Sequence, residues 1–176
     1  TEGYLELRST ELTEMEEFFI ENLGDSGNFG RLLGSLCRPG DIICLKGSMG
    51  AGKTTLTQSI AQGVGIKNNE YVTSPTFAVF QQYEGTIPLY HMDFYRLTGS
   101  DDILAMGLDE YFYMSGLCIL EWCERSEDIL PPEHLVLDIK IPQFDERRNI
   151  TLTAHDSSWL ERIALLKIRF QELKNE

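Results

Sequence analysis

One octapeptide constrains this chain more than any other feature, Gly47-Ser48-Met49-Gly50-Ala51-Gly52-Lys53-Thr54. It matches the G-x-x-x-x-G-K-[ST] pattern of a phosphate-binding loop in full. Glycines allow backbone conformations and a close approach that a Cβ would block, so the N–H groups of the loop can surround phosphate oxygens. In this pattern the lysine reaches the β- and γ-phosphates and the threonine hydroxyl binds Mg²⁺. The sequence therefore predicts a site for Mg²⁺ and a nucleoside triphosphate.

The residues on both sides of the loop provide the setting that it requires. Asp41–Leu45 is an apolar run after Pro39-Gly40 and predicts a buried strand. Thr55–Ala61 continues with helical spacing, and Gly63 or Gly65 would end that helix. Residues 1–176 are predicted to form a single α/β domain, the three-layer sandwich of phosphate-loop NTPases, with a mostly parallel sheet and helices on both faces.

Other segments add strands to this sheet. Phe77–Tyr83 and Ile87–Met92 flank Glu84-Gly85-Thr86 and predict an antiparallel hairpin. Further strands are expected at Tyr4–Arg8, Gly116–Leu120, Leu135–Ile139 and Asn149–Thr153.

Four more helical segments are predicted. The stretch Thr13-Glu14-Met15-Glu16 fits a capping box and indicates a helix start. Residues 24–28 suggest a break, after which a second helix covers Phe29–Leu36. Asp101–Tyr111 is expected to be a short helix, and Ser158 is expected to cap a C-terminal one.

Composition limits the kind of partner. The chain has 28 acidic and 15 basic residues, a net charge of −13, which argues against binding nucleic acid without help. The pair Arg147-Arg148 is too small for a basic patch, and an acidic surface that only maintains solubility is an equal alternative. The sequence contains no run of 18 apolar residues, so it predicts no membrane span. Four cysteines without a C-x-x-C pair are typical of free thiols in a reducing cytoplasm, which is the expected location.

Two acidic residues are candidates for catalysis. Glu121 follows the apolar run Leu117–Leu120, and an acid at the end of a parallel strand near a phosphate loop faces Mg²⁺ and the attacking water. The alternative is an ordinary acid that leaves a strand for solvent. In an extended segment, His91, Asp93 and Tyr95 would share one face, and Asp93 would supply a second carboxylate. A salt-bridged Asp93–Arg96 turn without a catalytic part is equally compatible with the sequence.

Several other residues have two possible roles. The hydroxyls of Thr73-Ser74-Pro75-Thr76-Phe77 would sense a γ-phosphate, or the segment is a plain entry into a strand. Trp122 is expected in the core rather than over the nucleotide. His134 and His155 are isolated and expected to be structural or exposed.

Together these segments resemble the bacterial TsaE (YjeE) family of small ATPases, which are needed for threonylcarbamoyl-adenosine modification of tRNA. The phosphate loop alone is generic, whereas the further motifs in this order are specific. The matching segments are Gly47–Thr55, Ser74–Phe77, His91–Leu97, Met106–Leu108 with Tyr111-Phe112, and Glu121-Trp122. Ser48 departs from the aspartate that the family usually has, and Cys123 from proline, serine or alanine.

The resemblance implies roles for individual residues. ATP phosphates would contact Ser48, Met49, Gly50, Ala51, Gly52, Lys53, Thr54 and Thr55. Thr54 and Glu121 would hold Mg²⁺, and Lys53, Glu121 and Asp93 would be required for hydrolysis. Thr10 and Arg148 are weaker candidates for contacts with adenine.

The resemblance also implies partners, TsaD and TsaB, with tRNA bound only through them. ATP turnover, weak in the isolated chain, would then reset the modifying complex. A small-molecule kinase is one alternative, although Glu121 to Leu135 offers only Arg125 for the arginine-rich lid that such kinases use. A nucleotide-sensing module without significant turnover is the other.

Overall fold

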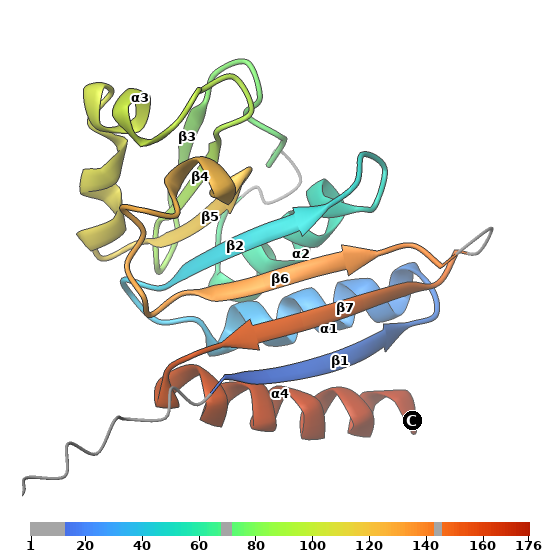
Figure 1. Ribbon diagram of the computed structural model, residues 1–176. Coiled ribbons are helices and arrows are strands. Elements are labelled where there is room, and N and C mark those ends of the chain that lie inside the picture. The colour runs from blue at the N-terminus through green and yellow to red at the C-terminus, as the bar shows by residue number, and fades with distance from the viewer. Residues whose placement is uncertain (1–12, 68–71, 143–145) are drawn as a thin grey trace, which may run out of the picture.

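Hydrogen bonding between seven strands builds one sheet in the order β1-β7-β6-β2-β5-β4-β3 (Figure 1). The computed structural model describes residues 13–67, 72–142 and 146–176. Neighbours among β6, β2, β5 and β4 pair in parallel, whereas β1–β7, β7–β6 and β3–β4 pair antiparallel. This arrangement confirms the parallel centre and the predicted hairpin. The strands are β1 Glu14–Ile20, β2 Ile42–Gly47, β3 Phe80–Tyr83, β4 Leu89–Asp93, β5 Leu117–Glu121, β6 Leu135–Lys140 and β7 Arg148–Ala154.

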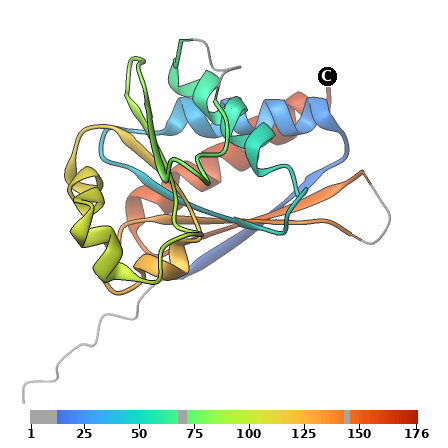
Figure 2. The same ribbon diagram turned by 90° about the horizontal axis from the view of Figure 1, so that it is seen from above.

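Helices cover both faces of the sheet, as predicted (Figure 2). Three long helices pack on one face, α1 (Leu23–Leu36), α2 (Lys53–Val64) and α4 (Ser157–Lys174). Over the β3–β4–β5 half of the other face lie α3 (Ser100–Ala105) and the 3₁₀ helices η2 (Leu108–Tyr113) and η3 (Cys123–Ser126). None of the helices in the described ranges is long and apolar enough to cross a membrane.

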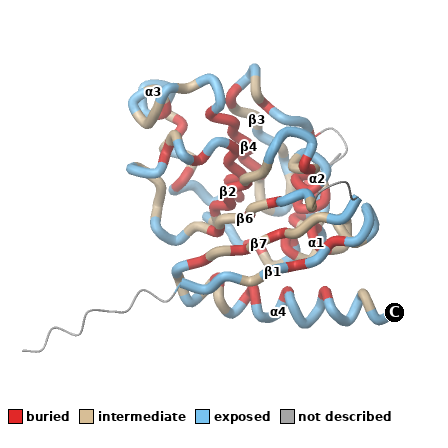
Figure 3. The backbone as a smooth tube through the Cα atoms, turned by 45° about the vertical axis from the view of Figure 1, so that its right-hand side comes forward, coloured by how far each residue is buried: buried red, intermediate tan, exposed pale blue. Residues whose placement is uncertain are grey.

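The central strand β2 is apolar on both sides because both of its faces are covered (Figure 3). Ile43 and Leu45 face the cluster that includes α1, α2 and α4. Ile42 and Cys44 face the cluster under α3 and η2. All four cysteines are buried and free, as expected. This packing leaves the carboxyl ends of β2, β5 and β4 at one edge, next to the start of α2.

The helix expected at Thr13-Glu14-Met15-Glu16 is wrong, because β1 begins at Glu14. Phe18 and Ile20 alternate with exposed residues and bury one face of β1 in the core. The strand pairs along its whole length with β7, a partner that no local pattern reveals. Tertiary pairing therefore overrides the local capping signal. The strand expected at Tyr4–Arg8 lies outside the described residues.

The helix expected from Phe29 in fact begins at Leu23. The Asn22 side chain caps it by accepting a 2.9 Å hydrogen bond from the Asp25 N–H. The break expected at residues 24–28 is wrong, because Gly24 and Gly27 lie inside this helix, downstream of its Asn22 cap. Two later glycines, Gly30 and Gly34, allow α1 to approach α2 closely, since a Cβ at Gly34 would lie 2.2 Å from the Ile60 carbonyl oxygen.

Two further helix boundaries differ from the prediction. The segment Asp101–Tyr111 is split at Gly107, whose φ of 70° is a left-handed conformation that glycine adopts readily. The C-terminal helix is capped by Asp156 rather than Ser158, because the Asp156 carboxylate accepts a 3.0 Å hydrogen bond from the Trp159 N–H.

Substitution of Gly34 tests the close contact between α1 and α2. We expect Gly34→Ala to lower the free energy of unfolding by about 1–3 kcal/mol, the usual cost of overpacking. Gly27→Ala in the same helix is the matched control, since its Cβ would meet only the flexible end of the Arg31 side chain. Urea denaturation measures both variants. Equal destabilisation in the two would contradict this packing.

Candidate active site

The phosphate loop connects β2 to α2 and is shaped by glycine conformations. Gly50 and Gly52 have φ values of 79° and 102°, in the left-handed region that a Cβ disfavours. The Lys53 ammonium donates a 2.9 Å hydrogen bond to the Gly47 carbonyl, so its side chain folds back over the loop. The lysine is therefore held where the loop can present it to an anion at the N-terminus of α2.

A cavity of about 920 Å³ lies in front of the loop. It brings most of the predicted site residues together with several that the sequence left open. Ala51, which is buried, lies outside its wall. The wall consists of Gly47, Ser48, Met49, Gly50, Gly52, Lys53, Thr54, Thr55, Ser74, Thr76, Asp93, Tyr95, Glu121 and Trp122.

The two candidate carboxylates reach this cavity from adjacent parallel strands. Asp93 ends β4 and Glu121 ends β5, and the two residues are register partners. Both are buried, with exposed fractions of 3% and 5%. Neither is an ordinary acid that leaves a strand for solvent. The alternation of β4 places His91 and Asp93 on one face, but the strand ends before Tyr95.

The carboxylate of Glu121 has a basic partner at each oxygen. The Lys53 Nζ lies 3.6 Å from Oε1, and His91 Nε2 lies 3.2 Å from Oε2. Burial opposes ionisation of Glu121, but the hydrogen bond from His91 and the nearby charges outweigh it and hold the pKa of Glu121 below its ordinary value. Glu121 is therefore an anion in the folded protein at neutral pH.

Hydroxyl groups hold the second carboxylate. Thr76 Oγ1 donates a 2.8 Å hydrogen bond to Asp93 Oδ2, and the Tyr95 N–H donates a 2.9 Å bond to Oδ1. Ser74 Oγ lies 3.4 Å from both Asp93 Oδ2 and Glu121 Oε2. The guanidinium of Arg96 instead lies over the Phe77 ring, 4.2 Å from its centroid. The structure thus favours an organised pair of carboxylates over an Asp93–Arg96 turn.

A strained turn keeps these hydroxyls beside Asp93. Val79 has a φ of 67°, which is unfavourable for a β-branched residue. Its N–H donates to the Pro75 carbonyl at 2.6 Å, and its own carbonyl accepts from the Asp93 N–H at 2.9 Å. No residue-type pattern predicts this turn, since valine disfavours positive φ.

The expectation that Trp122 belongs to the core is wrong. The backbone turns into a left-handed conformation at Trp122, with φ 60°, immediately after Glu121. The indole is 41% exposed, lines the cavity and packs against Tyr95 with ring centroids 5.0 Å apart. The sequence contains one signal for this position, a tryptophan directly after the candidate acid.

The donor set of the cavity suits Mg²⁺. Mg²⁺ prefers oxygen ligands and is usually held by one or two carboxylates together with substrate phosphates. Glu121 and Thr54 line the same cavity, together with Asp93. A larger cluster of metal-binding side chains is absent from the described part of the chain. This combination fits an ion that is bound together with a nucleotide.

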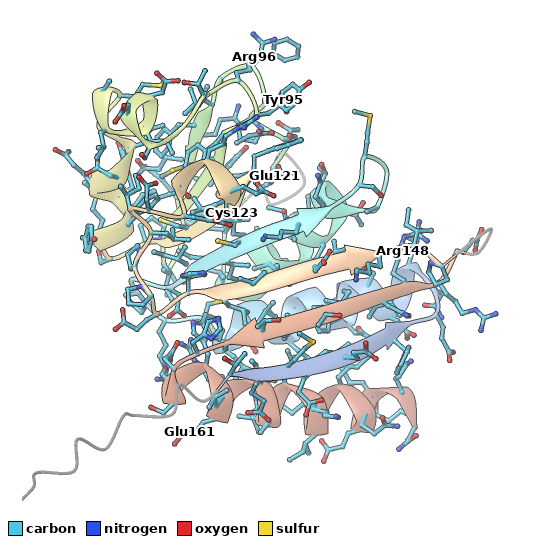
Figure 4. All side chains as sticks on the ribbon, viewed as in Figure 1. Tyr95, Arg96, Glu121, Cys123, Arg148 and Glu161 are labelled. Atoms are coloured by element: carbon cyan, nitrogen blue, oxygen red, sulfur yellow. The ribbon has the colours of Figure 1, made fainter. Side chains whose placement is uncertain are left out.

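Arg148 lies beside the loop but apart from the carboxylates (Figure 4). Its Nε donates a 3.0 Å hydrogen bond to the Ala51 carbonyl, and it lines a small hollow of about 60 Å³ with Asn22, Ala51 and Thr55. Thr10 lies outside the described residues. His134 and His155 hydrogen-bond to the Pro131 carbonyl and the Thr13 hydroxyl, away from the cavity.

Comparison with known proteins identifies the family of this chain. The family model described as "Threonylcarbamoyl adenosine biosynthesis protein TsaE" matches residues 20–150, more than half of the chain. The chain belongs to the TsaE family. It is 46% identical over 125 residues to the TsaE protein of Bacillus subtilis, covering 70% of this chain and 76% of the relative. It is 37% identical over 128 residues to that of Treponema pallidum, covering 73% of this chain and 93% of the relative.

A solved structure shows the same fold. The crystal structure of Bacillus subtilis YdiB superposes with a TM-score of 0.76 and 34% identity. The superposition covers 91% of this chain and 99% of that one. The likeness to that structure thus includes the arrangement of the sheet and its helices.

The lowered pKa of Glu121 makes stability depend on pH. Ionisation of Glu121 favours the folded state above its ordinary pKa, and this contribution is lost as the pH falls through the lowered value. We expect Glu121→Gln to be less stable than the unaltered chain near pH 7. The difference should shrink below about pH 4.3, the ordinary pKa of glutamate.

Urea denaturation over a series of pH values measures this difference. Glu161→Gln is the matched control, because Glu161 is exposed on α4, far from the cavity (Figure 4). A difference between Glu121→Gln and the unaltered chain that is constant with pH would contradict the assignment.

Proposed function

We propose that this chain is a Mg²⁺-dependent ATPase that serves the threonylcarbamoyl-adenosine modification of tRNA. The single observation that carries the proposal is the meeting of a phosphate-loop lysine with two buried carboxylates in one cavity. Lys53 lies 3.6 Å from Glu121, and Glu121 is the register partner of Asp93. Family membership supplies the process, since the relatives are named for tRNA threonylcarbamoyladenosine biosynthesis.

Each group has a place in phosphoryl transfer. The N–H groups of the loop and Lys53 would bind the ATP phosphates, and Thr54 and Glu121 would hold Mg²⁺. Bound Mg²⁺ would neutralise negative charge on the phosphates. Asp93, fixed by Thr76 and the Tyr95 N–H, would orient the attacking water. Catalysis would rest on positioning and charge stabilisation rather than on a covalent intermediate.

TsaD and TsaB are the partners we propose, with tRNA held by them rather than by this chain. The net charge of −13 supports this division, because phosphate neutralisation on tRNA requires a clustered basic face. ATP turnover would then reset the modifying assembly. Adenine would lie toward Arg148, which is hydrogen-bonded to the end of the loop at Ala51. The proposed site of action is the cytoplasm.

Phosphate release from Mg²⁺·ATP, with and without TsaB and TsaD, tests the proposal. We expect Lys53→Ala to weaken ATP binding about 10- to 100-fold, because a hydrogen bond to a charged group contributes about 1.5–3 kcal/mol. Partner-stimulated hydrolysis should be lost in this variant and in Glu121→Ala. Lys140→Ala, an exposed position on β6, is the matched control and should behave as the unaltered chain.

The phosphate-release assay, together with measurements of ATP binding and of phosphorylated products, separates the ATPase from the sensing module and the kinase. Hydrolysis that is unaffected by Glu121→Ala would refute the role of that carboxylate. Tight binding with no stimulated turnover would support a nucleotide-sensing module. Phosphate found on a small-molecule acceptor would support a kinase.

Fluorescence of Trp122 offers a direct measure of binding. Trp122 is 41% exposed in the wall of the cavity, whereas Trp159 is 1% exposed on the buried face of α4. We expect Mg²⁺·ATP to change the emission of the unaltered chain and not that of Trp122→Phe. Trp159→Phe is the control and should keep the response. A response retained in full by Trp122→Phe would contradict the placement of the nucleotide.

A further inference from the structure

We propose that His91 is a positioning residue that fixes the orientation of the Glu121 carboxylate toward bound Mg²⁺. The inference rests on the proposed function and deepens it, because it explains how the metal-binding carboxylate is oriented. His91 itself lies behind Glu121 and is not in the wall of the cavity. It would therefore act through Glu121 and not on the nucleotide.

The position of His91 is otherwise one for an apolar residue. It lies in the middle of β4 with an exposed fraction of 0%, and its register partner in β5 is Ile119. Leu89, two residues earlier on the same face, is also fully buried. A polar ring buried there is costly unless it is hydrogen-bonded, and its partner is Glu121. The alternation of β4 and β5 points His91 at Glu121.

The contact has a defined direction. A carboxylate oxygen only accepts hydrogen bonds, so His91 Nε2 carries the proton and donates to Glu121 Oε2 at 3.2 Å. His91 Nδ1 is buried and has no hydrogen-bond partner among the described residues. Within that part of the chain, the polar function of the ring is directed at Glu121 alone.

The other two contacts of Glu121 are shared with other groups. Lys53 also donates to the Gly47 carbonyl, and the proposed function directs it to the ATP phosphates. Ser74 Oγ is 3.4 Å from Glu121, and its hydroxyl is equally close to Asp93 and closer to Thr76, at 3.0 Å. Of these three contacts with described residues, the one from His91 is therefore the contact that is not shared with another group.

The two oxygens of the Glu121 carboxylate have different partners, and this sets the orientation of the carboxylate. With Oε2 held by His91, Oε1 is the oxygen on the side of Lys53 and the loop. Groups that hydrogen-bond to metal-binding carboxylates orient them, and their loss commonly weakens metal affinity about 10- to 100-fold. Without His91, the Glu121 side chain would rotate about its own bonds and present this oxygen less often.

The test measures binding of a fluorescent ATP analogue by the full chain, in a Mg²⁺ titration and in EDTA. We expect His91→Leu, which suits the apolar surroundings, to raise the Mg²⁺ concentration for half-maximal effect about 10- to 100-fold. Affinity in EDTA should be unchanged. His91→Gln, whose amide nitrogen can replace Nε2 as donor, should restore most of the Mg²⁺ response. Leu89→Val controls for loss of packing on the same face of β4.

A double variant tests whether His91 acts through Glu121. Glu121→Gln should weaken the Mg²⁺ response as much as His91→Leu or more, and adding His91→Leu to it should cause no further loss. An unchanged Mg²⁺ response in His91→Leu would overturn the inference while leaving the proposed function intact. A loss equal to that of Leu89→Val, in Mg²⁺ and EDTA alike, would also overturn it. An unchanged response in Glu121→Gln would refute the proposed metal site, and the inference with it.

Discussion

The register of the parallel strands β4, β5 and β2 is the constraint on which the rest of the site depends. It pairs Asp93 with Glu121 and Glu121 with Leu45, just before the chain enters the phosphate loop. Side chains alternate between the faces of a strand, so a slip of one residue would turn Glu121 toward the cluster under α3 and η2. Such a slip is unfavourable because it would bury the Glu121 carboxylate among apolar side chains, away from Lys53 and His91.

The site places ionisable groups where burial penalises charge. Asp93, Glu121 and His91 are all at most 5% exposed, and unpaired charges there would be strongly unfavourable. Each carboxylate is instead held by several donors, which keeps Glu121 ionised. A rigid set of anions beside a lysine is what binding of a metal–nucleotide complex requires, since such groups need little reorganisation when charge arrives.

Where the sequence and structure disagree, contacts between distant segments are the reason. The capping signal at Thr13-Glu14-Met15-Glu16 is local, but pairing with β7 and burial of Phe18 make the segment a strand. Gly24 and Gly27 resemble a helix break, yet they lie inside α1, which is held by the Asn22 cap and by the packing of Gly30 and Gly34 against α2. Trp122 is expected in the core from the sequence, yet its backbone is left-handed and the residue is exposed in the wall of the cavity.

The sequence by itself determined the phosphate loop, the strand and helix on either side of it and the central parallel strands, and it offered Asp93 and Glu121 as candidate carboxylates, each beside a non-catalytic alternative. Each of these follows from residues that are neighbours in the chain, through glycine conformation, hydrophobic periodicity or an acid at a strand end. Only the tertiary structure decided that Thr76 holds Asp93, that His91 and Lys53 hold Glu121, and that Trp122 borders the cavity. These contacts join segments brought together by strand order and register, which arise from the packing of the whole sheet and not from local sequence.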